Sequence, residues 1–215
     1  MDLLLIVPVL LFSVVVHEVA HAWQALREGD ATARDLGRLT LNPVRHLDPL
    51  GSFVVPLALY LLPGDFLFGW AKPVPVNPRN YRNYRAGDVR VSLAGIVSNL
   101  GLVVVCALAL AALTALQGIP QVGGSLGAII VAMATYGIFI NLILAYFNLI
   151  PVPPLDGSHV LYHLLPPAAG ARYRAMGRYG VAVLFLTVAF FPGALGAALS
   201  PVSAAFSWIV GVAAR

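Results

Sequence analysis

The first apolar run of the chain, residues 3–23, carries ionisable side chains in its second half. The run is long enough to cross a membrane, since a transmembrane helix needs about 20 mostly apolar residues. It nevertheless contains His17-Glu18-Val19-Ala20-His21. An ionisable side chain at the middle of a bilayer costs about 2.5 to 3.5 kcal/mol. Three such side chains in one predicted span therefore indicate a functional site inside a membrane protein.

Composition supports the membrane assignment. Apolar residues make up 60% of the chain and charged residues only 10%, against a charged share of about 25% in soluble domains. The net charge of +4 is not concentrated on one basic face, so we expect no nucleic acid partner. A single cysteine, Cys106, excludes a disulfide framework and a cysteine-based metal cluster.

Several further segments are apolar enough to span a bilayer. Residues 51–68 are apolar but are broken by Pro56 and by Pro63-Gly64-Asp65, so either a full crossing or a re-entrant hairpin is compatible with them. We predict an all-α integral membrane protein with about five to six transmembrane segments and a re-entrant or β-hairpin insertion after the first helix. It would form one domain over residues 1–215, with a core at about 1–165 and additional C-terminal helices at 173–213. The other predicted spans are residues 91–116, 125–149, 179–191 and 194–213.

Basic residues favour the re-entrant arrangement, because Lys and Arg near span ends are retained on the cytoplasmic side. If residues 51–68 dip in and return, with the amino terminus outside, all 13 Lys and Arg residues lie on that side. A full crossing would divide them four against nine. The connection 117–124, which would face outside, has no charge. The sequence thus predicts a multi-pass protein of a prokaryotic inner membrane.

The motif in the first span has the H-E-x-x-H pattern of zinc sites. Positions i and i+4 share one face of a helix, so His17 and His21 can hold one zinc ion while Glu18 reaches a zinc-bound water. The alternative is that both histidines only form hydrogen bonds within a helix bundle. A catalytic zinc ion normally has three protein ligands and leaves its fourth position open. A third ligand must therefore come from elsewhere in the chain.

Asp156 is the best candidate for the third ligand. It follows three prolines within four residues, which end a helix and force extended backbone. Non-helical backbone at membrane depth is tolerated only where protein or a water-filled cavity covers it. His21 lies six residues before Arg27, about 9 Å along a helix, and so near the cytoplasmic end of its span. In the re-entrant arrangement Asp156 reaches the same side, whereas a full crossing would separate it from His21.

Combined motifs over about residues 13–163 now support a family resemblance. The chain resembles the site-2 protease family of intramembrane zinc metalloproteases, in a compact form without a PDZ domain. Two positions, Ile96 and Ser158, depart from residues common in the family, and neither is a predicted ligand. The motifs are the H-E-x-x-H helix, Asn42-Pro43 with His46, Asp48, Pro49 and Gly51, the segment Gly69-Trp70-Ala71-Lys72-Pro73-Val74-Pro75-Val76-Asn77-Pro78, the G-x-x-x-N element Gly95 to Asn99, and Leu155-Asp156-Gly157.

The resemblance implies a function and a set of site residues. It implies that His17, His21 and Asp156 bind one zinc ion per chain and that Glu18 is the general base. It also implies that Asn148 helps to stabilise the tetrahedral intermediate. The expected reaction is hydrolysis of a peptide bond within or beside a transmembrane helix of a membrane-protein substrate in the lipid bilayer, with the active site toward the cytoplasm.

Other interpretations stay open at this point. The alternatives to a protease are a membrane metal-ion transporter and a non-catalytic protein that binds membrane helices. His159 and His163 are one turn apart and either form a second metal pair or have an interfacial or outer-shell role, and His46 has the same alternatives. Asn99 is either a site residue or an interhelical hydrogen-bonding residue. Residues 69–90 suit headgroup anchoring combined with an edge strand that clamps substrate.

Overall fold

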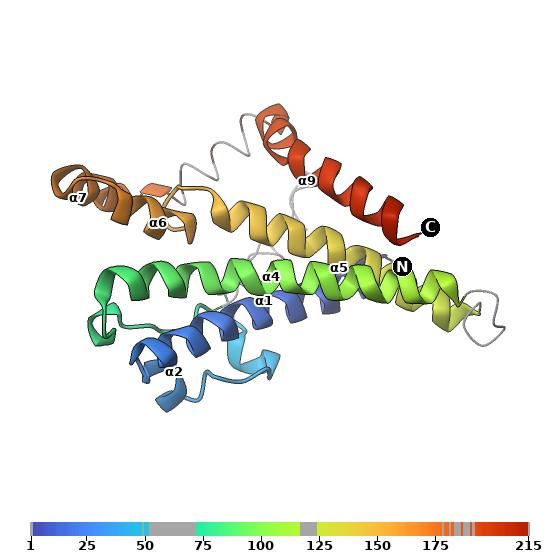
Figure 1. Cartoon of the computed structure of the whole chain (residues 1–215), viewed down its shortest axis with the longest axis horizontal. Coiled ribbons are helices and arrows are strands. Elements are labelled where there is room, and N and C mark those ends of the chain that lie inside the picture. Colours follow the sequence, from blue (N-terminus) through green and yellow to red (C-terminus); the bar gives the residue numbers. More distant parts are fainter. Residues whose placement is uncertain are drawn as a thin grey trace.

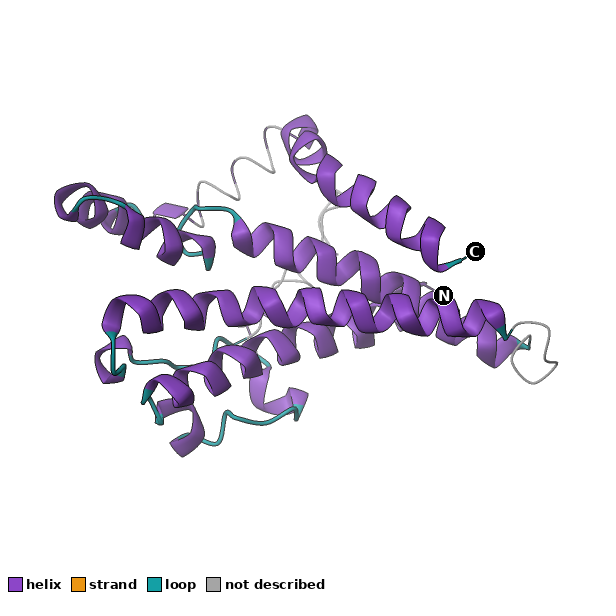
Figure 2. Ribbon diagram, in the orientation of Figure 1, coloured by secondary structure: helices purple, strands orange, loops and turns teal. Residues whose placement is uncertain are grey.

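The computed structural model describes residues 2–48, 50–51, 72–116, 124–177, 179–180, 182, 186, 190 and 192–214. These residues form helices joined by loops, with no strand among them (Figure 2). The elements are α1 (Asp2–Glu28), α2 (Thr32–Asp35), η1 (Pro43–His46), η3 (Pro78–Asn80), α4 (Tyr84–Ala115), α5 (Ser125–Leu149), α6 (Gly157–Leu164), α7 (Pro167–Ala175) and α9 (Pro192–Ala213).

Four of these helices, α1, α4, α5 and α9, are long and apolar enough to cross a membrane. The all-α prediction is confirmed, and the span predicted at 125–149 coincides with α5. Helix α4 begins seven residues earlier than the predicted 91, because the Asn83 side chain accepts a hydrogen bond from the Ala86 N–H and caps the helix there. The predictions for 51–68 and 179–191 fall largely outside the described residues.

Helices α1 and α5 run in the same direction and α4 runs in the opposite direction between them (Figure 1). Helix α4 packs against both, and α9 covers α5 and α4 on the other side. The C-terminal half of α1, the N-terminal half of α4 and the C-terminal end of α5 therefore share one end of the bundle (Figure 1). Short helices α2, α6 and α7 lie at this same end (Figure 1).

The interior of the bundle contains buried polar side chains as well as apolar ones. Ser13, Asn99 and Asn141 come from α1, α4 and α5, and each is at most 1% exposed. The Asn99 amide donates to Asn141 Oδ1 at 2.7 Å, and the Asn141 amide donates to Ser13 Oγ at 2.9 Å. Lipid gives no hydrophobic driving force between helices, so such interhelical hydrogen bonds contribute to association. These contacts tie the three helices together near their middle.

Residues 72–77, here called the strap, cross the bundle end beside α1. Their N–H groups donate to His46 O at 2.8 Å from Lys72, to Glu18 Oε2 at 2.7 Å from Val74, and to Asp30 Oδ2 at 2.6 Å from Asn77. The edge strand expected here is wrong for this described stretch, which is neither helix nor strand. Its N–H groups bind two side chains and a loop carbonyl instead of a neighbouring strand.

Asp30 anchors the strap and is fully buried. Burial raises the pKa of its carboxyl, but hydrogen bonds from the Asn77 N–H, the Thr32 hydroxyl and the Asn80 amide outweigh this, and the net pKa lies below its ordinary value. A carboxyl with a lower pKa in the folded state stabilises the fold above its unfolded pKa of about 3.9. That contribution is lost as the pH falls through the folded value.

We therefore expect the substitution Asp30→Asn to destabilise the protein at neutral pH by about 1 to 3 kcal/mol. The new side-chain NH₂ group would face groups that themselves donate to the Asp30 carboxylate, such as the Asn77 N–H. Thermal unfolding in detergent between pH 3 and pH 7 measures this effect. The difference in Tm between the two proteins should be largest at pH 7 and should shrink in acid. Equal Tm values at pH 7 would contradict the assigned role of the carboxylate.

Candidate metal centre

Three donor atoms meet at the shared end of the bundle. His17 Nε2 and His21 Nε2 lie 2.9 Å apart, and Asp156 Oδ2 lies 3.2 Å from the first and 3.3 Å from the second. In the described part of the chain, this is the one group of three or more His, Cys, Asp or Glu side chains whose donor atoms all lie within 4.8 Å of one another. The structure thus brings a histidine pair of the first helix together with a carboxylate from the second half of the chain.

The separations fit a tetrahedral ion. Two ligands that are each about 2.0 to 2.1 Å from a tetrahedral zinc ion lie roughly 3.3 Å from one another. All three observed distances are close to this value. In addition, Asp156 Oδ2 is buried and accepts no hydrogen bond, although two imidazole nitrogens face it. A buried carboxylate oxygen in this situation suits a cation.

The remaining nitrogens of both imidazoles are held by helix α4. His17 Nδ1 lies 2.6 Å from Asn99 Oδ1, and His21 Nδ1 lies 2.7 Å from Val91 O. The Asn141 amide nitrogen donates to the carbonyl of Gly137, so its Oδ1 must accept from Asn99, which leaves Asn99 Oδ1 for His17. Both partners are acceptors, so both Nδ1 atoms carry the proton. In the neutral form of each imidazole, Nε2 then presents a lone pair to the site, as a metal ligand must.

Gly95 supplies the space that the two imidazoles occupy. A Cβ atom at this position would lie 2.5 Å from His17 Cε1 and 2.6 Å from the Nε2 atoms of His17 and His21. The sequence contains the G-x-x-x-N element but leaves the role of Asn99 open. In the structure, Val91, Gly95 and Asn99 lie on one face of α4 and all three serve the paired imidazoles.

Asp156 is presented by the loop that follows α5. The helix ends at Leu149, and Ile150 has extended φ and ψ angles of −61° and 128°. Gly157 then starts α6 in contact with the carbonyl of Leu149, where a Cβ atom would clash. The chain can therefore turn back against the end of α5, which holds Asp156 beside α1.

The two other predicted site residues lie near this end of the bundle. Glu18 follows His17 on α1, and its Oε2 accepts the Val74 N–H of the strap at 2.7 Å. Asn148 is in the last turn of α5, and its amide nitrogen donates to Leu144 O at 2.9 Å. Its amide is thus directed to its own helix rather than to the three donor atoms.

The remaining histidines do not form a second metal site with converging donors in the described part of the chain. His159 and His163 both face Asp88, and their donor atoms do not gather as those of the first site do. This agrees with an interfacial role. His46 contacts the carbonyl of Thr40 through Nε2 at 2.8 Å in the loop after α2. Sequence reasoning missed Asp88, since one acid near basic residues gives no signal of its own.

The role of Gly95 can be tested directly. We expect Gly95→Ala to reduce zinc affinity at least tenfold, because the added methyl group forces one or both imidazoles out of position. In the apoprotein, overpacking at this buried position costs about 1 to 3 kcal/mol, and the preference of a helix interior for alanine over glycine offsets only about 1 kcal/mol of it. Zinc content after purification and chelator competition measure the effect.

Gly101→Ala is the matched control for this substitution. Gly101 lies on the same helix, and no atom of another described helix lies within 4 Å of the place that its new methyl group would take, so the variant should keep wild-type zinc affinity. Full zinc affinity in Gly95→Ala would contradict the assigned packing.

Comparison of the sequence with known proteins identifies a family. The sequence profile described as Peptidase family M50 matches residues 49–191, which include Asp156 but not the motif of α1. YwhC of Bacillus subtilis (strain 168), named as a candidate zinc metalloprotease, is 40% identical over 181 residues, which are 83% of the chain and 78% of YwhC. No solved structure matches the chain.

Two mycobacterial relatives, both called Rip2 and named in the same way, are longer. The protein of Mycobacterium tuberculosis (strain H37Rv) is 34% identical over 84% of the chain and 64% of its own length. That of Mycolicibacterium smegmatis is 30% identical over 83% of the chain and 65% of its own length. The chain thus spans just under two thirds of the Rip2 proteins. The family and these relatives indicate a membrane metallopeptidase that uses zinc. The chain belongs to peptidase family M50, the site-2 protease family.

Proposed function

We propose that this protein is an intramembrane zinc protease that hydrolyses peptide bonds within or beside transmembrane helices of membrane-protein substrates. The convergence of His17 Nε2, His21 Nε2 and Asp156 Oδ2 within 3.3 Å of one another carries the proposal. These residues would hold one zinc ion. When bound there, zinc supplies a Lewis acid that brings the pKa of a water ligand to about 7.

Glu18 would act as the general base. One of its oxygens accepts the Val74 N–H, which orients the carboxylate and leaves the other oxygen to take a proton from water. The same carboxylic acid would then protonate the leaving amine. Asn148 would donate its amide to the developing oxyanion, which requires that it first leave the carbonyl of Leu144.

The strap would hold the substrate. A helical substrate hides its carbonyl groups in its own hydrogen bonds and must unwind locally before it can react. Pro73 and Pro75 have no N–H, and the Val74 N–H between them binds Glu18. A substrate laid along the strap would therefore meet carbonyl acceptors beside the general base.

The site would face the cytoplasm, with residues 51–68 re-entrant. Two observations support this topology. Helices α1 and α5 run in the same direction (Figure 1), and the Lys72 N–H donates to His46 O at 2.8 Å. The chain therefore leaves and re-enters the described region at adjacent points on one side. The basic residues of the loops then share that side.

The protease proposal predicts different phenotypes for a base variant and a ligand variant. Glu18→Gln should keep zinc, because the glutamine still accepts the Val74 N–H and is not a ligand. It should lower cleavage of a membrane substrate by at least about a hundredfold, because an amide does not accept the proton. His17→Ala should lose both zinc and cleavage.

Comparing membrane proteomes of cells that carry wild-type protein or Glu18→Gln, by mass spectrometry, would reveal uncut substrates. The variant should accumulate intact transmembrane proteins whose fragments appear with the wild type. Cleavage by Glu18→Gln at the wild-type rate would disprove the assignment of the base, and retained zinc in His17→Ala would disprove the ligand set.

Topology is checked independently of activity. Reporter fusions or cysteine labelling at Asn80, in η3, should report the cytoplasm, and the same probes at Ser125, the first residue of α5, should report the outside. Native Cys106 is replaced by alanine in the labelling experiments. An outside position for Asn80 would overturn the proposed orientation of the site.

A further inference from the structure

Helix α6 begins one residue after Asp156, and the carboxylate of Asp88 on α4 contacts both histidines of α6. We propose that Asp88 is a positioning residue, which sets the location of Asp156 by anchoring α6 to α4. The group formed by Asp88, His159, His163 and Arg174 is here called the Asp88 clamp. This inference rests on the proposed role of Asp156 as a zinc ligand.

The contacts of the clamp are specific. Asp88 is only 3% exposed. His159 Nδ1 lies 3.2 Å from each of its carboxylate oxygens, and His163 Nε2 lies 2.8 Å from Oδ2. Arg174 of α7 approaches Oδ2 to 3.8 Å. A buried carboxylate is stable only when hydrogen-bonded and paired, and its partners here come mainly from α6. Asp88 therefore fixes the position of that helix.

Backbone hydrogen bonds transmit this position to the metal ligand. The His159 N–H donates to Asp156 O at 3.0 Å, and the Ser158 N–H donates to Leu155 O at 3.0 Å. The first turn of α6 and the loop that carries Asp156 are thus one hydrogen-bonded unit. A shift of His159 relative to α4 would displace the carboxylate of Asp156 relative to the imidazoles.

The same face of α4 holds the other two ligands. Asp88, Val91, Gly95 and Asn99 follow one another at spacings of three, four and four residues, so they form one stripe along the helix. Val91 O and Asn99 Oδ1 accept hydrogen bonds from the two imidazoles, as described above. Helix α4 therefore positions all three donors of the site. Val91 and Asn99 act on the two histidines of α1, and Asp88 acts on Asp156.

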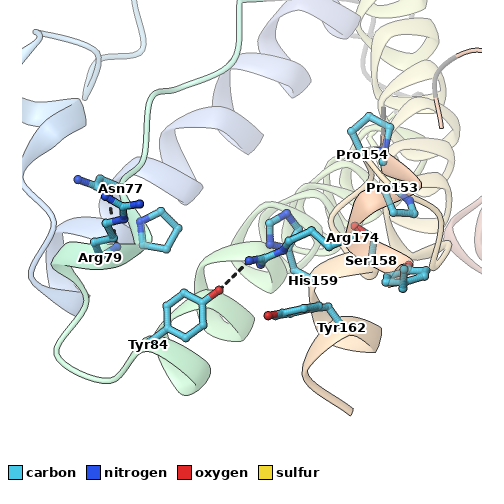
Figure 3. Close-up of a pocket in the computed structure, with 12 residues that line it drawn as sticks. Asn77, Arg79, Tyr84, Pro153, Pro154, Ser158, His159, Tyr162 and Arg174 are labelled. Carbon is cyan, nitrogen blue, oxygen red and sulfur yellow. Dashed lines mark hydrogen bonds between the residues drawn. The ribbon is translucent and has the colours of Figure 1, made fainter. Parts of the chain in front are cut away.

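The clamp lies beside a cavity of about 510 Å³ that is lined by Tyr84, His159, Tyr162 and Arg174, among others (Figure 3). Arg174 donates to the hydroxyl of Tyr84 at 2.9 Å and stacks over the ring of Tyr162 at 3.9 Å (Figure 3). These contacts add α7 to the assembly of α4 and α6. Of the two histidines in the clamp, His159 is the more exposed, with a side chain 39% exposed against 7% for His163, and so tolerates substitution better.

The test compares Asp88→Asn with wild type in the full chain in detergent. Zinc affinity is measured by chelator competition, and the ligand geometry is measured from the visible absorption of the cobalt-substituted protein. We expect about 10- to 100-fold weaker zinc binding, as is typical when a group that orients a metal ligand is removed. We also expect an altered cobalt spectrum. Unfolding of the apoprotein is followed in parallel.

Asp30→Asn is the matched control, because Asp30 is also a buried carboxylate but anchors the strap instead of α6. It should lower thermal stability while zinc affinity stays within twofold of wild type and the cobalt spectrum is unchanged. If the two variants lost zinc affinity equally, the loss in Asp88→Asn would be explained by general destabilisation, and the proposal would be overturned.

A second pair of variants keeps the test decisive if Asp88→Asn does not fold. His159→Gln retains a donor for Asp88 and should bind zinc within threefold of wild type, whereas His159→Leu should weaken binding at least tenfold. Equal zinc affinity and cobalt spectra for His159→Leu and wild type would overturn the inference alone. Failure of wild-type protein to bind zinc, or retention of zinc by His17→Ala, would instead overturn the proposed function.

Discussion

The contact between His17 and Asn99 is the interaction on which the rest of the site depends. In a bilayer, a buried imidazole needs a partner for its second nitrogen, and Asn99 provides one at 2.6 Å. Because Asn99 is itself held by Asn141, its orientation is fixed by a chain of hydrogen bonds that ends at a backbone carbonyl. The network that associates three helices therefore also directs Nδ1 of the proposed zinc ligand His17 away from the site. Packing and chemistry share the same few polar side chains.

Helix direction explains why the site lies near one end of the bundle. Two helices that run the same way bring the histidine pair and the carboxylate to a common level (Figure 1). The antiparallel helix between them supplies hydrogen-bond acceptors for the imidazoles, and the lack of a side chain at Gly95 leaves room for them. The opposite half of the bundle is packed differently, with Val103, Leu110 and Ile138 forming an apolar core against α9. The apolar half thus contributes packing alone, whereas the polar half contributes both packing and the site.

Much of this arrangement could be predicted from the sequence, because it follows from rules that act along the chain. Apolar length gave the limits of α5, and the re-entrant arrangement of residues 51–68 predicted that His21 and Asp156 reach the same side. The Asp88 clamp and the Ser13–Asn141 contact could not be predicted, since they depend on how neighbouring helices are rotated about their axes. The edge strand was wrong for a local reason: alternating prolines supplied the pattern of a strand, but no neighbouring strand in the described part of the chain accepts the remaining N–H groups.

The bond between Glu18 and the strap has a practical consequence for handling the purified protein. The proposed metal donors belong to α1 and to the loop before α6, whereas the proposed base is oriented by a loop N–H outside the spanning helices. Extraction conditions that loosen this loop would leave the ion in place and the carboxylate misaligned. Metal occupancy is therefore an insufficient criterion of competence, and preparations are better ranked by the integrity of the strap, for instance through protection of its backbone from proteolysis.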